Sequence, residues 1–239
     1  MLNIHTKNVS RVIRNMLLSL KSQKNLLAGS EINRWLAGSM LFSVFLVIAR
    51  IVYSGNLTFI FLTWNLFLAA IPYFITYQLR NKPNLVLSKW KFSLVFLVWL
   101  LFIPNSFYII TDLFHLGQPI VPIWFDLAVI ISFAWNGLLL GVLSVREMEK
   151  HVTVIFRLRN ELSFLLPVMF LNALGIYVGR FLRFNSWDVI SNPFALASEI
   201  IDLLIHPFTH KYPWAMIGCY SLLMSFFYIT LKKIGKQIL

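Results

Sequence analysis

Residues 92–116 read FSLVFLVWLLFIPNSFYIITDLFHL, and this stretch decides the class of fold. It is long and apolar enough to cross a bilayer, which takes about 20 residues in a helix. Its second half nevertheless carries four polar side chains at steps of three, four and three: Asn105, Tyr108, Asp112 and His115. At this spacing they share one face of a helix. Because such a face is costly in lipid, we expect it to turn toward the protein interior.

The composition indicates an integral membrane protein. Of the 239 residues, 59% are hydrophobic and 13% are charged, whereas soluble domains are about half apolar and a quarter charged. The single cysteine, Cys219, excludes an intrachain disulfide framework and a multi-cysteine metal site. The net charge of +12 comes from basic residues between apolar segments, so we expect membrane topology rather than nucleic-acid binding to explain it.

Apolar windows predict six membrane-spanning helices. Their ranges are 36–53, 58–79, 92–116, 120–144, 162–182 and 214–231. The runs are continuously apolar rather than alternating, so they do not have the pattern of spanning strands. The predicted fold class is an all-α integral membrane protein, a bundle of about six transmembrane helices in a lipid bilayer.

Basic residues predict the orientation of this bundle. Residues 1–35 hold six Lys or Arg, residues 80–91 hold four, residues 146–159 hold four and residues 232–239 hold three. These segments all lie on the same side of the predicted spans. By the positive-inside rule, both the N and the C termini are expected to be cytoplasmic.

Three segments outside the spans have patterns of their own. Residues 1–35 read as a cytoplasmic basic amphipathic segment that would bind anionic inner-leaflet lipids, with a partly disordered tail as the alternative. Residues 232–239 read as a cytoplasmic basic tail. On the outer side, Asn192 as N-cap and Pro193 as first helical residue predict a short interfacial helix near 193–205.

Candidate catalytic residues gather toward the outer ends of the spans: Asp112, His115 and Asp126. The Asp-x-x-His step places Asp112 and His115 on one helical face, where they could act as an acid/base pair. The same three residues could be ligands of a divalent metal. This step is common by chance, so a metal is possible but not favoured, and a histidine bonded to a neighbouring aspartate is the simpler alternative.

Candidate substrate-binding residues lie near the same ends: Asn105, Tyr108, Arg180, Arg183, Asn185, Trp187 and Asp188. Arg180 and Arg183 lie one turn apart and offer fork-shaped donors for phosphate or carboxylate. They could instead snorkel to lipid head groups, or pair with Asp112 or Asp126 and hold the helices together. Pro104 frees a carbonyl that Asn105 could satisfy, or it is a simple kink.

Four stretches resemble a known family: TWNLFLAAIPY (63–73), LFIPNSFYIITDLFHL (101–116), PIWFD (122–126) and GIYVGRFLRFNSWDVISNP (175–193). The family is an uncharacterised group of bacterial integral membrane proteins, a domain of unknown function, and its motifs read LFxPNxxYxxTDLxHL and GRFLRxNSWD. The resemblance spans about residues 45 to 230. It implies a multi-pass protein of the bacterial cytoplasmic (cell) membrane and brings no activity or protein partner with it.

Three function hypotheses stay open. The first is a membrane-embedded enzyme that acts on a lipid-linked or anionic substrate in an outward-facing polar pocket, lined by the third, fourth and fifth spans and the 183–213 connection. The second is a small transporter or proton-coupled carrier built around a helix break at Pro104, which the few polar residues of the cytoplasmic half disfavour. The third is a non-catalytic membrane assembly partner whose polar cluster is structural.

Overall fold

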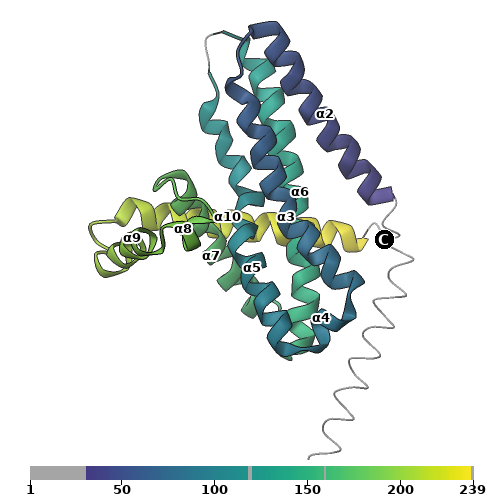
Figure 1. Ribbon diagram of the computed structural model, residues 1–239, viewed down its shortest axis with the longest axis vertical. Coiled ribbons are helices and arrows are strands. Elements are labelled where there is room, and N and C mark those ends of the chain that lie inside the picture. The colour runs from purple at the N-terminus through teal and green to yellow at the C-terminus, as the bar shows by residue number, and fades with distance from the viewer. Residues whose placement is uncertain (1–30, 118–119, 159, 238–239) are drawn as a thin grey trace, which may run out of the picture.

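A computed structural model of the chain describes residues 31–117, 120–158 and 160–237, and the regular elements of these residues are all helical (Figure 1). The long helices are α2 (Glu31–Ser54), α3 (Phe61–Asn81), α5 (Lys89–Tyr108), α6 (Ile123–Ile155), α7 (Leu162–Arg180) and α10 (Lys211–Gln237). The short ones are η1 (Thr58–Ile60), α4 (Pro83–Leu87), η2 (Ile109–His115), α8 (Asp188–Ser191) and α9 (Pro193–Ile205). The amphipathic segment expected before Glu31 lies outside the described residues.

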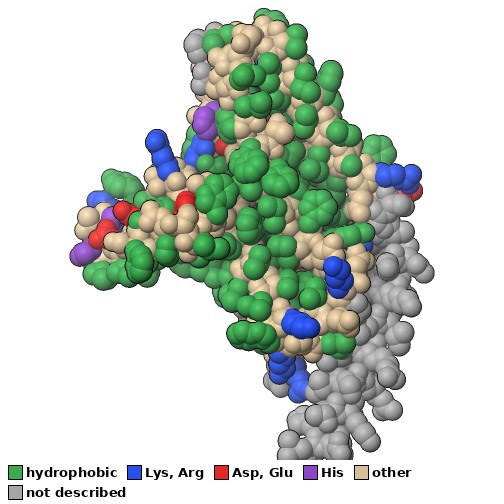
Figure 2. All heavy atoms as spheres, in the orientation of Figure 1, with side chains coloured by type: hydrophobic (Ala, Val, Ile, Leu, Met, Phe, Trp, Pro, Cys, Tyr) green, Lys and Arg blue, Asp and Glu red, His purple; other side chains and the backbone are tan. Residues whose placement is uncertain are grey.

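Six of these helical segments are long and apolar enough to cross a membrane, which confirms the predicted fold class. Large apolar side chains cover the visible face of the bundle, as Figure 2 shows. Trp35, Val52 and Trp90 each have more than 70% of their surface exposed. Soluble monomers do not expose apolar surface on this scale, so the faces of these helices match lipid tails.

Helix α6 is the centre of the bundle. In its apolar window 67% of the residues are buried, against 22% in α2. It contacts α2, α3, α5, η2 and α10, while α7 packs mainly on α5 and α10. In Figure 1, α3 and α6 run alongside each other, and α10 runs across them. The spans are therefore not a set of parallel rods.

The helices continue beyond the apolar windows. Helix α6 reaches Ile155, although its predicted span ends at 144, because its final turns are buried against other helices: Met148 and Val152 pack in the hydrophobic core. Charged neighbours such as Lys150 end the hydropathy signal without ending the helix. Tertiary contacts, not apolar composition, support this part of α6.

The predicted third span is not one continuous α-helix. It is α-helical to Tyr108 and then winds as a 3₁₀-helix through His115. A 3₁₀-helix has three residues per turn and seldom exceeds four residues, so a run of seven is unusual. At this winding Asp112 and His115 lie directly above one another, rather than offset as in an α-helix.

The bundle has two chemically different ends. The ends of α3, α6 and α10 and the starts of α5 and α7 form what we call the basic end, which carries most of the Lys and Arg among the described residues. Figure 2 shows basic side chains over the region of α4. The ends of α2, α5 and α7 and the starts of α3, α6 and α10 form the opposite end, which we call the site end.

Candidate functional site

Arg180, in the last turn of α7, is the centre of the polar cluster at the site end. Its Nη1 donates to the Tyr108 hydroxyl and to Oδ1 of Asp112, both at 3.2 Å. Its Nη2 donates to the Thr111 carbonyl at 2.8 Å and lies 3.1 Å from Nδ1 of His115. The two terminal nitrogens carry four N–H groups, and these four contacts engage them all. In this arrangement Arg180 holds η2 in place and has no terminal N–H left for a phosphate.

Asp112 joins three helices. Its side chain is completely buried, Oδ1 pairs with Arg180 of α7, and Oδ2 accepts a hydrogen bond from Nδ2 of Asn65 in α3 at 3.0 Å. Of the pairings that the sequence allowed, the structure contains Asp112 with Arg180. Because both oxygens are occupied and neither is exposed, this carboxylate positions its neighbours and does not reach a ligand.

His115 contacts both Arg180 and the backbone of its own helical segment. Nδ1 faces Nη2 of Arg180, and it also lies 3.3 Å from the backbone carbonyl of Asp112. A guanidinium only donates, so Nδ1 accepts and the ring proton is assigned to Nε2. The ring contacts the backbone carbonyl of Asp112 rather than the carboxylate that a histidine–aspartate pair would use.

Asp126 belongs to a separate pair. Its Oδ1 lies 2.7 Å from Nε of Arg50, near the end of α2, and the two side chains are 0% and 1% exposed. The sequence suggested Arg180 or Arg183 as the partner of Asp126. The structure differs because α6 packs beside α2, so the start of α6 meets the end of α2 instead of α7.

The three candidate metal ligands are not assembled. Within residues 31–117, 120–158 and 160–237 no group of three or more His, Cys, Asp or Glu side chains is placed to hold a metal ion. Asp126 is held by Arg50, and Asp112 already binds Arg180 and Asn65. The donor set that the Asp-x-x-His step suggested is therefore divided between two ion pairs.

A cavity of about 390 Å³ opens next to this cluster. Its walls come from α3, α5, α7, residues 184–186, α8 and α9, and none of its lining residues belongs to α6. The pocket predicted between the third, fourth and fifth spans is thus formed by the second, third and fifth spans and the following connection. The fourth span is instead the buried centre of the bundle.

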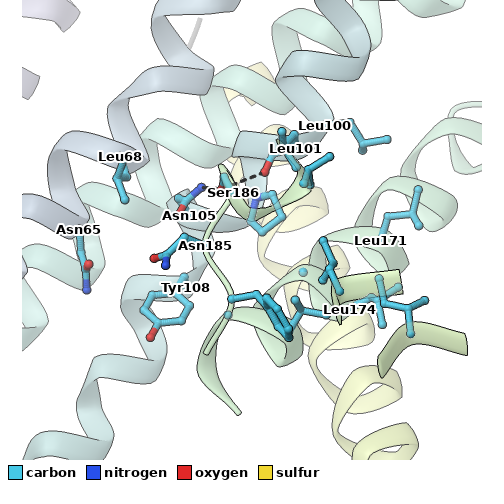
Figure 3. A pocket seen from close by; sticks show the side chains of 18 of the residues that line it. Asn65, Leu68, Leu100, Leu101, Asn105, Tyr108, Leu171, Leu174, Asn185 and Ser186 are labelled. Carbon is cyan, nitrogen blue, oxygen red and sulfur yellow. Dashed lines mark hydrogen bonds between the residues drawn. The ribbon is translucent and has the colours of Figure 1, made fainter. Parts of the chain in front are cut away.

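The cavity has a polar side and an apolar side (Figure 3). Its polar lining consists of uncharged groups: Asn65, Asn105, Tyr108, Asn185 and Ser186. The opposite wall in Figure 3 is formed by leucines: Leu100, Leu101, Leu171 and Leu174. None of the described residues that line this space is charged, and Tyr108 is the link between the cavity and the Arg180 cluster.

Helix α5 continues through Pro104, so the helix break that the sequence allowed is not present, and polar contacts gather beside the proline instead. Asn105 donates from Nδ2 to the Phe102 carbonyl and to Oγ of Ser186, each at 3.0 Å. The Ser186 hydroxyl contacts the Leu101 carbonyl at 3.3 Å. Pro104 itself packs on Gly175 of α7, where a Cβ atom would lie 2.5 Å from its ring. These contacts hold α5 and α7 close together and fix the loop that follows α7 against α5.

The other candidate residues lie in the turn after α7. Arg183 is exposed, has a φ of 60°, and forms none of the ion pairs found in the described part of the chain. Trp187 is 43% exposed and does not line the cavity. The Asn185 backbone N–H and the Ser191 hydroxyl bind the Asp188 carboxylate and hold its pKa below the usual range. Of these four predicted residues, only Asn185 reaches the cavity.

Residues of the site end that were missed as site candidates include Asn65, Ser186 and Arg50. Ser186 carries no sequence signal beyond its place in a polar turn. Arg50 did carry one, because it is the only charged residue between Trp35 and Leu79. A lone charge in an apolar span needs a buried counter-charge, which Asp126 supplies.

Comparison with known proteins gives one family. The family described as "Protein of unknown function (DUF1361)" matches residues 64–229, a range that begins later than the resemblance expected from about residue 45. It includes every residue of the Arg180 cluster and of the cavity wall. No curated protein and no solved structure matches the chain.

Proposed function

Because the chain belongs to this family of proteins of unknown function, DUF1361, we propose a function from its own geometry: it binds an amphiphilic, lipid-like molecule at the site end of the bundle. One observation carries the proposal, namely the cavity of about 390 Å³ with an apolar wall of leucines and a polar wall of amides and hydroxyls. Ligand sites in proteins are typically about 300–1,000 Å³ and combine apolar walls with a few polar groups. An apolar chain along the leucines would bring a polar head to Asn105, Tyr108 and Asn185.

The head of this ligand is expected to be uncharged. The polar wall offers amide and hydroxyl groups, which bind alcohols, amides and sugars in both donor and acceptor roles. Arg180 does not line the cavity, and its terminal N–H groups are bound within the protein. These contacts favour a neutral lipid-linked ligand over the anionic one that two adjacent arginines suggested.

An enzyme acting on such a ligand is the second candidate, and Tyr108 is the observation that favours it. Its hydroxyl accepts a charge-assisted hydrogen bond from Arg180, and the residue also lines the cavity. Accepting from a cation polarises the phenol and makes its own O–H a stronger donor. In this scheme Tyr108 contacts the substrate, while Asp112 and His115 position Arg180 behind it.

The placement in the membrane is part of the proposal. We place the chain in the bacterial cytoplasmic membrane with its basic end on the cytoplasmic side, following the distribution of Lys and Arg. Helix α9 would lie in the outer interface, and its exposed apolar side chains support this: Phe194, Ile201, Leu204 and Ile205. The indole N–H of Trp214 donates to the Leu203 carbonyl and ties α9 to α10.

Binding of pyrene-labelled probes to detergent-purified protein tests the proposal. The probes are a long-chain alcohol, the matching fatty acid and the matching alkane. Leu174→Trp fills the cavity and is expected to weaken binding of the alcohol about tenfold or more, the equivalent of about 1.4 kcal/mol. Leu222→Trp changes an exposed leucine of α10 outside the cavity and should leave binding unchanged.

Tyr108→Phe separates recognition of the head from recognition of the chain. Removing one hydrogen bond should weaken binding of the alcohol probe about 3- to 10-fold and leave binding of the alkane probe unchanged. Equal affinity of Leu174→Trp and Leu222→Trp for the alcohol would show that the cavity is not the binding site. Tighter binding of the fatty acid than of the alcohol would contradict a neutral head.

A further inference from the structure

A second cavity, of about 60 Å³, lies at the basic end of the bundle. It is bounded by the start of α2, the end of α3 and the second half of α6. Four charged residues line it: Arg80, Arg146, Glu147 and Lys150. It is thus a small, mostly basic space, lined by the second half of α3, whereas the first cavity is lined by the first half of that helix.

The charges around this space are not balanced by other groups of the described residues. Nζ of Lys150 pairs with Oε2 of Glu147 at 3.0 Å, which leaves the two arginines. Neither Arg80 nor Arg146 is in an ion pair within the part of the chain that the structure describes. Nε of Arg80 is buried there without an acceptor. A buried donor without an acceptor is rare in proteins. A negatively charged ligand that accepts hydrogen bonds would satisfy this donor and balance the two arginines.

Glu147 adds a second requirement. Its Oε1 is also buried without a hydrogen-bond partner, at 3.7 Å from Nε2 of His151. A ligand that matches this cavity therefore accepts hydrogen bonds from arginine and donates one to a carboxylate. Hydrogen phosphate and singly protonated phosphate monoesters do both, whereas sulfate and phosphodiesters carry no proton to donate.

We propose that this cavity is a binding site for a protonated phosphate group, either free phosphate or the monoester head of a lipid. The planar forks of Arg80 and Arg146 match the oxygen atoms of a phosphate. The cavity is small, about 60 Å³, and this suits a single tetrahedral group. The site is independent of the amphiphile cavity, because no residue lines both.

Thermal unfolding of the purified protein in detergent tests the site. Millimolar phosphate is expected to raise the unfolding midpoint by about 2 °C or more over sulfate at equal ionic strength. In a second arm, mixed micelles with phosphatidic acid are compared with micelles containing phosphatidylglycerol. A rise in the first arm identifies free phosphate as a ligand, and a rise in the second identifies a lipid monoester.

Two matched double variants assign the effect to the cavity. Arg80→Gln with Arg146→Gln should abolish the phosphate-specific rise. Lys89→Gln with Lys91→Gln removes the same charge from exposed positions near the same end. This pair should keep the phosphate-specific rise. Arg80→Lys with Arg146→Lys keeps the charge but removes the planar guanidinium groups, so it should reduce the phosphate-specific rise. This pair replaces the Gln pair in the test if the Gln pair does not fold.

The outcomes are separable. No rise of wild type in either arm would overturn the proposal, as would an equal rise with phosphate and sulfate. If the Lys89/Lys91 pair lost the phosphate-specific rise as fully as the Arg80/Arg146 pair, general surface charge and not the cavity would be its cause. Binding of the pyrene probes does not enter this test, so it can fail while the proposed function stands.

Discussion

Replacing Asp126 by asparagine leaves the buried Arg50 at the site end without a negatively charged partner. Arg50 is 1% exposed, and its Nε and Nη2 lie 2.7 and 3.5 Å from the two oxygens of Asp126. Its Cζ lies 3.8 Å above the Phe59 ring, and its Nη1 already has no hydrogen-bond partner. Removing one partner of a buried ion pair costs about 3–5 kcal/mol. We expect about 4 kcal/mol here, because asparagine has no charge and no other anion pairs with Arg50 within the described residues.

Asp112→Asn is the comparison that makes this magnitude informative. Arg180 is 13% exposed and would keep three other acceptors: Tyr108, the Thr111 carbonyl and His115. We therefore expect a smaller loss, about 3 kcal/mol, at the lower limit for broken buried pairs. The ranking of the two variants follows from the number of remaining acceptors and from burial alone.

Thermal unfolding followed by tryptophan fluorescence measures both variants. For a chain of this size about 1 kcal/mol corresponds to about 2–4 °C, so Asp126→Asn should lower the midpoint by about 8–16 °C. Glu199→Gln removes an exposed acid and should change it by about 2 °C or less. A smaller shift for Asp126→Asn than for Asp112→Asn would refute the reasoning. Replacing Arg50 and Asp126 together by Met and Leu should restore most of the loss.

Three further changes probe other contacts. Gly175→Ala places a methyl group 2.5 Å from the Pro104 ring and should destabilise the protein by about 1–3 kcal/mol in the same unfolding assay. Ser144→Ala removes the acceptor 2.8 Å from the buried Trp99 N–H and should cost about 1–3 kcal/mol. Hydrogen bonds from His210 and His206 hold the pKa of Asp202 below its usual range. The contribution of Asp202 to stability is therefore present above about pH 4 and is lost as the pH falls through the lowered pKa. Amide exchange at the end of α9 should accelerate at that acidic pH in wild type, and Asp202→Asn should remove this dependence.

Each of these changes has a control. Gly218→Ala adds a methyl group where no atom lies within 4 Å, and it should be neutral or slightly stabilising. Ser225→Ala removes a hydroxyl that bonds only its own helix, so its cost should be smaller than that of the Ser144 variant. Glu199→Gln lies on the same helix as Asp202 and should keep the acid dependence. A control as damaging as its partner would show that the named contact is not the cause.

The sequence identified the polar face of residues 105–115 but not all of its roles. Asn105, Tyr108, Asp112 and His115 do turn inward, as their cost in lipid requires. A helical wheel cannot tell which of them meets a cavity and which is covered. That division depends on η2, whose tighter winding buries Asp112 against Arg180 and leaves Tyr108 at the cavity wall.

The sequence by itself determined the six apolar helices, because transfer of a segment into lipid depends on its own composition and length. It also determined that charged groups near the ends of spans must find partners, since an unpaired charge there is expensive. Only the tertiary structure decided the partners, joining Asp126 to Arg50 and Asp112 to Arg180. Pairing depends on which helices are neighbours and how each is rotated, and these follow from packing across distant segments. Hydropathy and charge along one segment contain no record of that packing.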